Sequence, residues 1–139
     1  MEGKKILVVE DDLTWLELLS IVLDKNGLEY DAFVRVYEDV DGYEFMDIGG
    51  KRHKLDLSNY WVALVDGKLK TSVPQGIDLA RKLPKEGLPV VAMSGSKYLN
   101  DEMVGVGALI GFPKDQLFGK LSSQQLNLAE IVAAARKAS

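Results

Sequence analysis

The segment that decides the fold lies near the N-terminus and reads Ile6-Leu7-Val8-Val9-Glu10-Asp11-Asp12. Its four apolar residues form a short continuous run, which is typical of a strand buried on both faces of a parallel sheet. An apolar stripe at helical spacing follows the acidic residues and consists of Trp15, Leu18, Leu19 and Val22. Asn26-Gly27 then marks the expected end of the helix. The segment therefore predicts a strand, an acidic turn and a helix, the opening unit of an α/β fold.

The same alternation continues along the chain. Further strands are expected at 28–36, 61–65, 89–93 and 108–112, and helices at 77–83, ending at Pro84, and at 98–104, the latter with at most two turns. A last helix is expected to begin at a capping box formed by Ser122 and Gln125, with an apolar stripe of Leu128, Ile131, Val132 and Ala135. This order predicts a doubly wound parallel sheet of five strands.

The interval between Tyr37 and Tyr60 does not follow this alternation. Residues 43–48 alternate at period two, Gly49-Gly50 supplies a turn, and 54–57 alternate again. This pattern predicts a β-hairpin in place of the second helix or beside it. Two roles stay open for it: a surface for a partner protein, bearing Tyr43, Phe45 and Ile48, or an apolar cover for the core.

Composition limits the function classes. The chain has 139 residues, of which 47% are hydrophobic and 27% charged, so one domain spanning 1–139 is expected. There is no cysteine, which excludes disulfides and thiolate metal sites. The net charge of −4 without a long basic run argues against a nucleic-acid partner. Neither a signal peptide nor a membrane span is evident, and a cytoplasmic location is the expectation.

Polar residues stand at the expected ends of four strands. Glu10 and Asp11 follow the first strand, Asp66 follows 61–65, Ser94 follows 89–93, and Lys114 follows 108–112 after Pro113. In an open parallel sheet, ligands bind outside the carboxyl ends of the strands, so these residues can converge. Carboxylate oxygens suit Mg²⁺, and an ammonium and a hydroxyl suit a phosphoryl group. The pattern predicts a divalent-metal and phosphoryl site.

These segments resemble the receiver domain of bacterial two-component response regulators. The resemblance rests on Val8-Val9-Glu10-Asp11-Asp12, on a buried strand ending in Asp66, on Ser94-Gly95, and on Gly107-Ala108 with Lys114 seven residues after the glycine. It covers essentially the whole chain except 37–60. It implies a flavodoxin-like fold and a single-domain response regulator that signals by contact with another protein.

The resemblance also implies a role for each site residue. Asp66 is the expected phosphoryl acceptor, Ser94 the hydroxyl that reports on the phosphoryl group, and Lys114 the ammonium that pairs with it. Asp11 is expected to bind Mg²⁺ directly, Glu10 through water, Asp66 as a further carboxylate, and Lys68 through its backbone carbonyl; Asp12 is not counted as a ligand. The phosphodonor would be a sensor histidine kinase, a phosphotransfer protein or a small acyl phosphate, and the acceptor would lose the group by slow self-dephosphorylation.

Several features leave other interpretations open. The family commonly has an aromatic residue three places before the lysine, where this chain has Gly111, and the helix before it is interrupted by Gly105 and Gly107. These departures favour a pseudo-receiver that acts as an unphosphorylated interaction module. A phosphatase of the haloacid type is a further alternative, opposed by Lys68, because that family has a second Asp there. Strand-end acids can also be simple helix caps. His53 lies in a charge run and is expected to be solvated.

Overall fold

A five-stranded parallel sheet forms the centre of the protein, as the sequence predicts. The computed structural model describes residues 4–69, 74–122, 130 and 132–133. The strand order is β2-β1-β6-β7-β8, the flavodoxin-like order once the inserted strands are set aside. The bounds are Lys5–Val9 for β1, Tyr30–Phe33 for β2, Tyr60–Val65 for β6, Val90–Ser94 for β7 and Ile110–Pro113 for β8.

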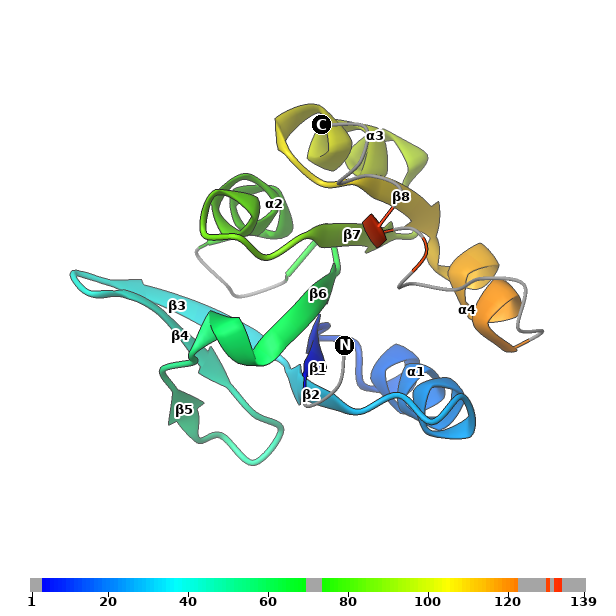
Figure 1. Ribbon diagram of the computed structural model, residues 1–139, viewed down its shortest axis with the longest axis horizontal. Helices are drawn as coiled ribbons and strands as arrows, with labels where there is room; N and C mark the ends of the chain where they lie inside the picture. The colour runs from blue at the N-terminus through cyan, green and yellow to red at the C-terminus, as the bar shows by residue number, and fades with distance from the viewer. Residues whose placement is uncertain (1–3, 70–73, 123–129, 131, 134–139) are drawn as a thin grey trace.

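Helices cover both faces of this sheet (Figure 1). They are α1 (Leu13–Lys25), α2 (Gly76–Lys85), α3 (Lys97–Val106) and α4 (Lys114–Ser122). Two expectations were wrong. Helix α2 does not stop at Pro84 but includes it and continues to Lys85. Helix α3 has 10 residues, more than the two turns expected, because Gly105 is accommodated within it and the helix ends only at Gly107, whose φ is 150°. Ser122 is the last described residue of α4.

The remaining part of the expected last helix is mostly outside the described residues. Gln125, Leu128, Ile131 and Ala135 lie there, so the capping box stays a prediction. Val132 is described and is buried against the α1 side of the sheet, in agreement with its place on an apolar stripe. Among the described residues, no helix is long and apolar enough to cross a membrane.

The insertion forms a second, antiparallel sheet with the order β3-β4-β5 (Figure 1). Its strands are β3 (Arg35–Asp39), β4 (Gly42–Met46) and β5 (Arg52–His53). The expected hairpin around Gly49-Gly50 is present as the β4–β5 pair. The hairpin strands cover more of the chain than expected. The longer strand pair is β3–β4, and β3 begins within residues 28–36, the segment expected to form the second strand of the parallel sheet.

Side-chain capping explains why the second arm of that hairpin is short. The Asp47 carboxylate accepts hydrogen bonds from the Gly49 and Lys51 N–H groups, both at 3.0 Å, and so fixes the turn. The Asp56 carboxylate accepts from the Ser58 N–H at 3.0 Å and starts a short 3-10 helix, Leu57–Asn59. Residues 54–57 therefore do not extend β5, which corrects the expectation for that segment.

Two apolar cores lie on the two faces of the parallel sheet. The residues of β1 alternate between them: Ile6 and Val8 face α1 and α4, whereas Leu7 and Val9 face α2 and α3. Val36 and Phe45 of the insertion are buried in the second of these cores, with Phe45 only 2% exposed. The inner side of the inserted sheet thus covers the core that a second helix would otherwise cover. Of Tyr43, Phe45 and Ile48, the side chains considered for a partner surface, only Ile48 is largely exposed.

Candidate functional site

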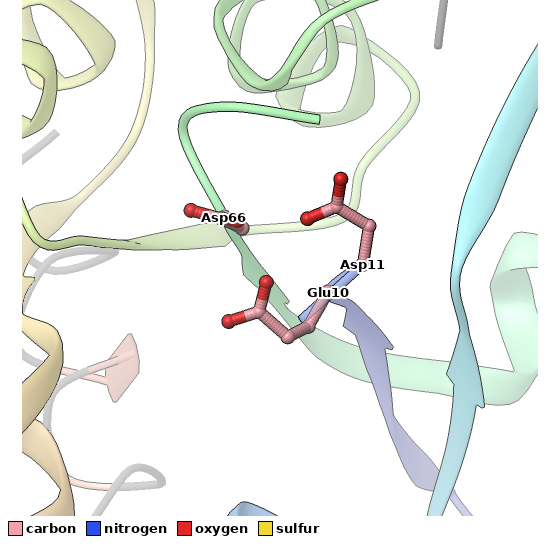
Figure 2. A group of neighbouring side chains, drawn as sticks. All are labelled: Glu10, Asp11 and Asp66. Atoms are coloured by element: carbon pink, nitrogen blue, oxygen red, sulfur yellow. The ribbon is translucent and has the colours of Figure 1, made fainter. Parts of the chain in front are cut away.

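Three carboxylates meet where the strand order of the parallel sheet reverses. Strands β1 and β6 pair with Val9 opposite Val65, so Glu10, Asp11 and Asp66 leave the sheet side by side. The Asp66 N–H bonds to the Val9 carbonyl at 2.9 Å, which fixes the two strand ends against each other. Figure 2 shows the three side chains gathered at these ends, and one carboxylate oxygen from each lies within 4.8 Å of the others. The expected convergence of these acids is confirmed.

Lys114 completes this group from the far edge of the sheet. It follows β8 as the first residue of α4, and its Nζ lies 2.6 Å from Glu10 Oε1 and 3.3 Å from Asp66 Oδ2. Burial lowers the pKa of Lys114, but hydrogen bonding and the charges of Glu10 and Asp66 outweigh this and raise it. The ammonium therefore stays charged and links the first acid to Asp66.

Glu10 is the most buried of the three acids, with 1% exposed. Burial raises its pKa, and the neighbouring Asp66 raises it further against the lowering effect of Lys114. Its Oε1 atom has the Lys114 ion pair but, among the described residues, no hydrogen bond of good geometry, while Oε2 accepts a long one, 3.4 Å from the Asp12 N–H. Glu10 thus carries a carboxylate that its surroundings only partly satisfy.

Asp12 has a different task from its two acidic neighbours. Its Oδ1 accepts hydrogen bonds from the N–H groups of Thr14 at 3.0 Å and Trp15 at 3.3 Å, so it is the N-cap of α1. The capping interpretation of the acidic run is therefore right for Asp12, and its exclusion from the metal ligands stays a prediction.

The segment after Asp66 is held by Gln75, whose role the sequence analysis did not foresee. The Gln75 side chain accepts from the Leu69 N–H at 2.9 Å and donates to the Leu69 carbonyl at 2.7 Å. The Lys68 N–H lies 3.4 Å from Asp66 Oδ1, at the limit of a hydrogen bond. Lys68 thus lies beside Asp66, and the role of its carbonyl as a metal ligand stays a prediction.

Glycines allow the loops to approach Asp66 closely. A Cβ on Gly76, the first residue of α2, would lie 2.1 Å from the Asp66 carbonyl oxygen. A Cβ on Gly67 would lie 3.1 Å from the Ser94 Cβ. Ser94 is buried at the end of β7, and the second distance places its side chain against the segment that carries Asp66.

Asn100 is a buried polar residue of α3 that sequence reasoning also missed. It bonds both the N–H and the carbonyl of Ser94. The sequence signal for its burial was its spacing, three residues before Met103, which places both residues on one face of α3. These two are the buried residues of that helix. An Asn on the apolar stripe of a helix indicates a hydrogen-bond partner in the core.

His53 lies away from the candidate site, on the inserted sheet. It is half-buried, its Nε2 lies 2.8 Å from Asp47 Oδ2, and its ring packs edge-on against Phe33. The expectation that it is simply solvated was wrong, because Asp47 provides a partner within the turn.

The donor set fits a hard divalent cation. With all three acids ionised, the three carboxylates and the ammonium give the site a formal charge of −2, which a dication would balance. Mg²⁺ takes oxygen ligands in octahedral geometry and usually keeps several waters, so one or two direct carboxylates suffice. The incompletely bonded Oε1 and Oε2 atoms of Glu10 supply acceptors for such waters.

Comparison with known proteins gives a structural match and no match by sequence. No family model matches the chain, and no curated protein matches it. The receiver domain of NtrX from Brucella abortus superposes with a TM-score of 0.58 at 21% identity, covering 86% of this chain and 98% of that one. A CheY-like response regulator receiver domain protein from Methanospirillum hungatei gives 0.54 at 18% identity, covering 98% of each chain.

Longer NtrX chains from the same organism match as well. One of them gives a TM-score of 0.67 at 19% identity and covers 96% of this chain. This chain spans only 28% of that protein's length. The strand order, the two-sided helix layers and these likenesses together show that the chain has the fold of a response regulator receiver domain.

Proposed function

We propose that this protein is a phosphoacceptor receiver that takes a phosphoryl group on Asp66 and signals by contact with another protein. The observation that carries the proposal is the placement of the Lys114 ammonium between Glu10 and Asp66, with Asp11 beside them, at the switch point of the sheet. The receiver fold supports it, and the insertion is the main departure from that fold.

Asp66 is suited to act as the nucleophile. One of its carboxylate oxygens would attack the phosphorus of a phosphohistidine or an acyl phosphate, and a new P–O bond would form while the bond to the donor breaks. The donor group leaves with the electron pair, and Asp66 becomes a mixed anhydride. No base is needed, because a carboxylate is ionised at neutral pH when a cation stands beside it.

The other residues would position the phosphoryl group and neutralise the charge on its oxygens. Lys114 would pair with the transferred phosphoryl oxygens, and Ser94 would donate its hydroxyl proton to one of them. Asp11 and Asp66, with Glu10 through water and the Lys68 carbonyl, would hold Mg²⁺, which when bound supplies the charge that offsets the incoming oxygens. Hydrolysis of the anhydride by water would return the protein to its starting state slowly.

The partners follow from this chemistry. A sensor histidine kinase or a phosphotransfer protein would supply the phosphoryl group, in the cytoplasm, and a downstream protein would distinguish the two states of Asp66.

Intact-mass measurement after incubation with acetyl phosphate and Mg²⁺ tests the proposal. We expect a gain of one phosphoryl group in the wild type and in Asp12→Asn, which keeps the helix cap, and no gain in Asp66→Asn or without Mg²⁺. A mass gain that persists in Asp66→Asn would place the acceptor elsewhere and refute the assignment.

A pseudo-receiver is the second candidate, and one observation favours it. A Cβ on Gly111 would lie 2.7 Å from the Asn100 Cβ, so the usual aromatic residue could not stand there without moving α3. If the wild type gains no mass but still binds a partner protein, the interaction module is the better description.

A further inference from the structure

Asn100 fixes the backbone at the end of β7 from two sides. Its Oδ1 accepts from the Ser94 N–H at 2.9 Å, and its Nδ2 donates to the Ser94 carbonyl oxygen at 3.2 Å. Asn100 is 3% exposed, so water does not compete for these bonds. Ser94 is the last residue of β7 and stands in register with Pro113, the last residue of β8. The carboxamide thus bonds both backbone groups of the residue where the strand ends.

The Ser94 hydroxyl is oriented as well. Its Oγ accepts a hydrogen bond from the Ser96 N–H at 3.1 Å. A serine hydroxyl has one proton to donate and lone pairs that accept, so this bond leaves the proton for an oxygen in the pocket. A Cβ at Gly67, the residue after Asp66, would lie 3.1 Å from the Ser94 Cβ, so Ser94 packs against the segment that carries Asp66.

Gly111 is the feature of β8 that admits Asn100. A Cβ at Gly111 would lie 2.7 Å from the Asn100 Cβ and 3.3 Å from its Cα and Cγ. Even the smallest side chain at 111 would therefore push α3, and the carboxamide with it, away from Ser94. The two hydrogen bonds between Asn100 and Ser94 therefore require that residue 111 has no side chain.

We infer that Asn100 is a positioning residue for phosphoryl transfer, which aims the Ser94 hydroxyl at the phosphoryl group, and that Gly111 is required to seat it. The inference rests on the proposed function, since the group that Ser94 would contact is the phosphoryl group on Asp66. In the family this chain resembles, an aromatic residue commonly stands at the position of Gly111. Here the glycine leaves that space to the buried carboxamide of Asn100.

A double-mutant cycle between Asn100 and Ser94 separates positioning from a general structural effect. With acetyl phosphate and Mg²⁺, we expect Ser94→Ala to slow phosphorylation about tenfold, the scale of one hydrogen bond to a charged group. Asn100→Ala should slow the wild type by a similar factor and should slow Ser94→Ala by less than about twofold. Asp101→Asn, on the exposed side of the same helix, is the matched control and should leave the rate unchanged.

Amide exchange and a second variant extend the test. The exchange measurement does not depend on phosphorylation, and the second variant does not depend on the folding of Asn100→Ala. Amide hydrogen exchange at Ser94, followed by NMR, should be about tenfold faster in Asn100→Ala, because its N–H loses its acceptor. Gly111→Ala should reproduce both effects with Asn100 unchanged. If Asn100→Ala does not fold, Asn100→Ser replaces it, since its side chain is too short to bond both Ser94 groups.

The outcomes are distinct. Unchanged Ser94 exchange in folded Asn100 and Gly111 variants would overturn the inference, as would equal slowing by Asn100→Ala with and without the Ser94 hydroxyl. A wild type that takes no phosphoryl group would overturn the proposed function, and the positioning role with it, even where Ser94 exchange shows the two bonds.

Discussion

Adjacent acidic residues at the end of β1 carry separate tasks, and their surroundings decide which. Asp12 points to the free N–H groups of α1, where a side-chain oxygen satisfies donors that the helix leaves unpaired. Glu10 turns into the sheet edge and meets Lys114. The residue type alone does not distinguish them. The sequence therefore predicts the acidic cluster but not which acid caps α1 and which one pairs with Lys114.

Asp12 therefore gives a clean stability test. Asp12→Ala should lower the free energy of unfolding by about 1 kcal/mol, because the Thr14 and Trp15 N–H groups lose their acceptor, whereas Asp12→Asn should change it by a few tenths at most. Urea denaturation measures both. Equal destabilisation by the two variants would mean that the charge, and not the cap, is what matters at this position.

The turn of the inserted sheet contains a carboxyl group, that of Asp47, whose pKa is lowered by its hydrogen-bond partners. Hydrogen bonding to His53, and then to the Lys51 and Gly49 N–H groups, lowers the pKa of Asp47 below its ordinary 3.8. A carboxyl whose pKa is lower in the folded state stabilises the fold above its ordinary pKa, and this stabilisation is lost as the pH falls through the folded value.

Asp47→Asn should therefore have a lower melting temperature than the wild type near neutral pH, and the difference should shrink below about pH 4. Asn keeps an oxygen for the two turn N–H groups, so the change isolates the charge facing His53. Thermal melts from neutral pH down to about pH 2.5 would check it. A gap between the two proteins that stays constant over this range would contradict the argument.

At the scale of elements, continuous apolar strands were predictable and short polar elements were not. Residues 61–65 are apolar throughout because β6 is buried on both faces, and this pattern leaves little alternative. Strand β3 begins one residue after β2 ends, with only Val34 between them, so the periodicity of 28–36 gives no sign that the chain changes sheet. Helix α4 has only one acidic residue in its first turn and a glycine within it, and it forms where packing against α1 and β8 favours it.

The inserted sheet is part of the core on its inner side, and one pair of substitutions tests this. Phe45→Ala should cost about 3–5 kcal/mol, because a fully buried ring leaves a cavity between β4 and the parallel sheet. Ile48→Ser, in the exposed turn that follows β4, should stay within about 0.5 kcal/mol. Chemical denaturation of both proteins is the measurement.

Deletion of residues 42–57 should accordingly give an unfolded product. A deletion protein that stays folded would show instead that the hairpin is dispensable for the core, and the surface around exposed Ile48 would then regain interest as a partner contact.

At the scale of the whole molecule, the site ties together strand ends that come from distant parts of the chain. Glu10, Asp66 and Lys114 follow β1, β6 and β8, and two of the three clustered acids, Glu10 and Asp66, share the Lys114 ammonium. Repulsion among the acids favours local opening of these ends in the absence of a cation. A ligand that binds only the folded arrangement stabilises the entire fold by mass action.

Mg²⁺ should thus raise the melting temperature of the whole protein. At a free concentration about ten times the dissociation constant, linkage gives about 1.4 kcal/mol, which corresponds to roughly 3–6 °C for a chain of this size. Asp11→Asn should reduce the shift strongly, because it removes the carboxylate expected to bind directly, and Asp12→Asn should retain it as the matched control. A shift of equal size in both variants would mean that the cation acts by general screening and not at this site, since screening does not distinguish neighbouring carboxylates.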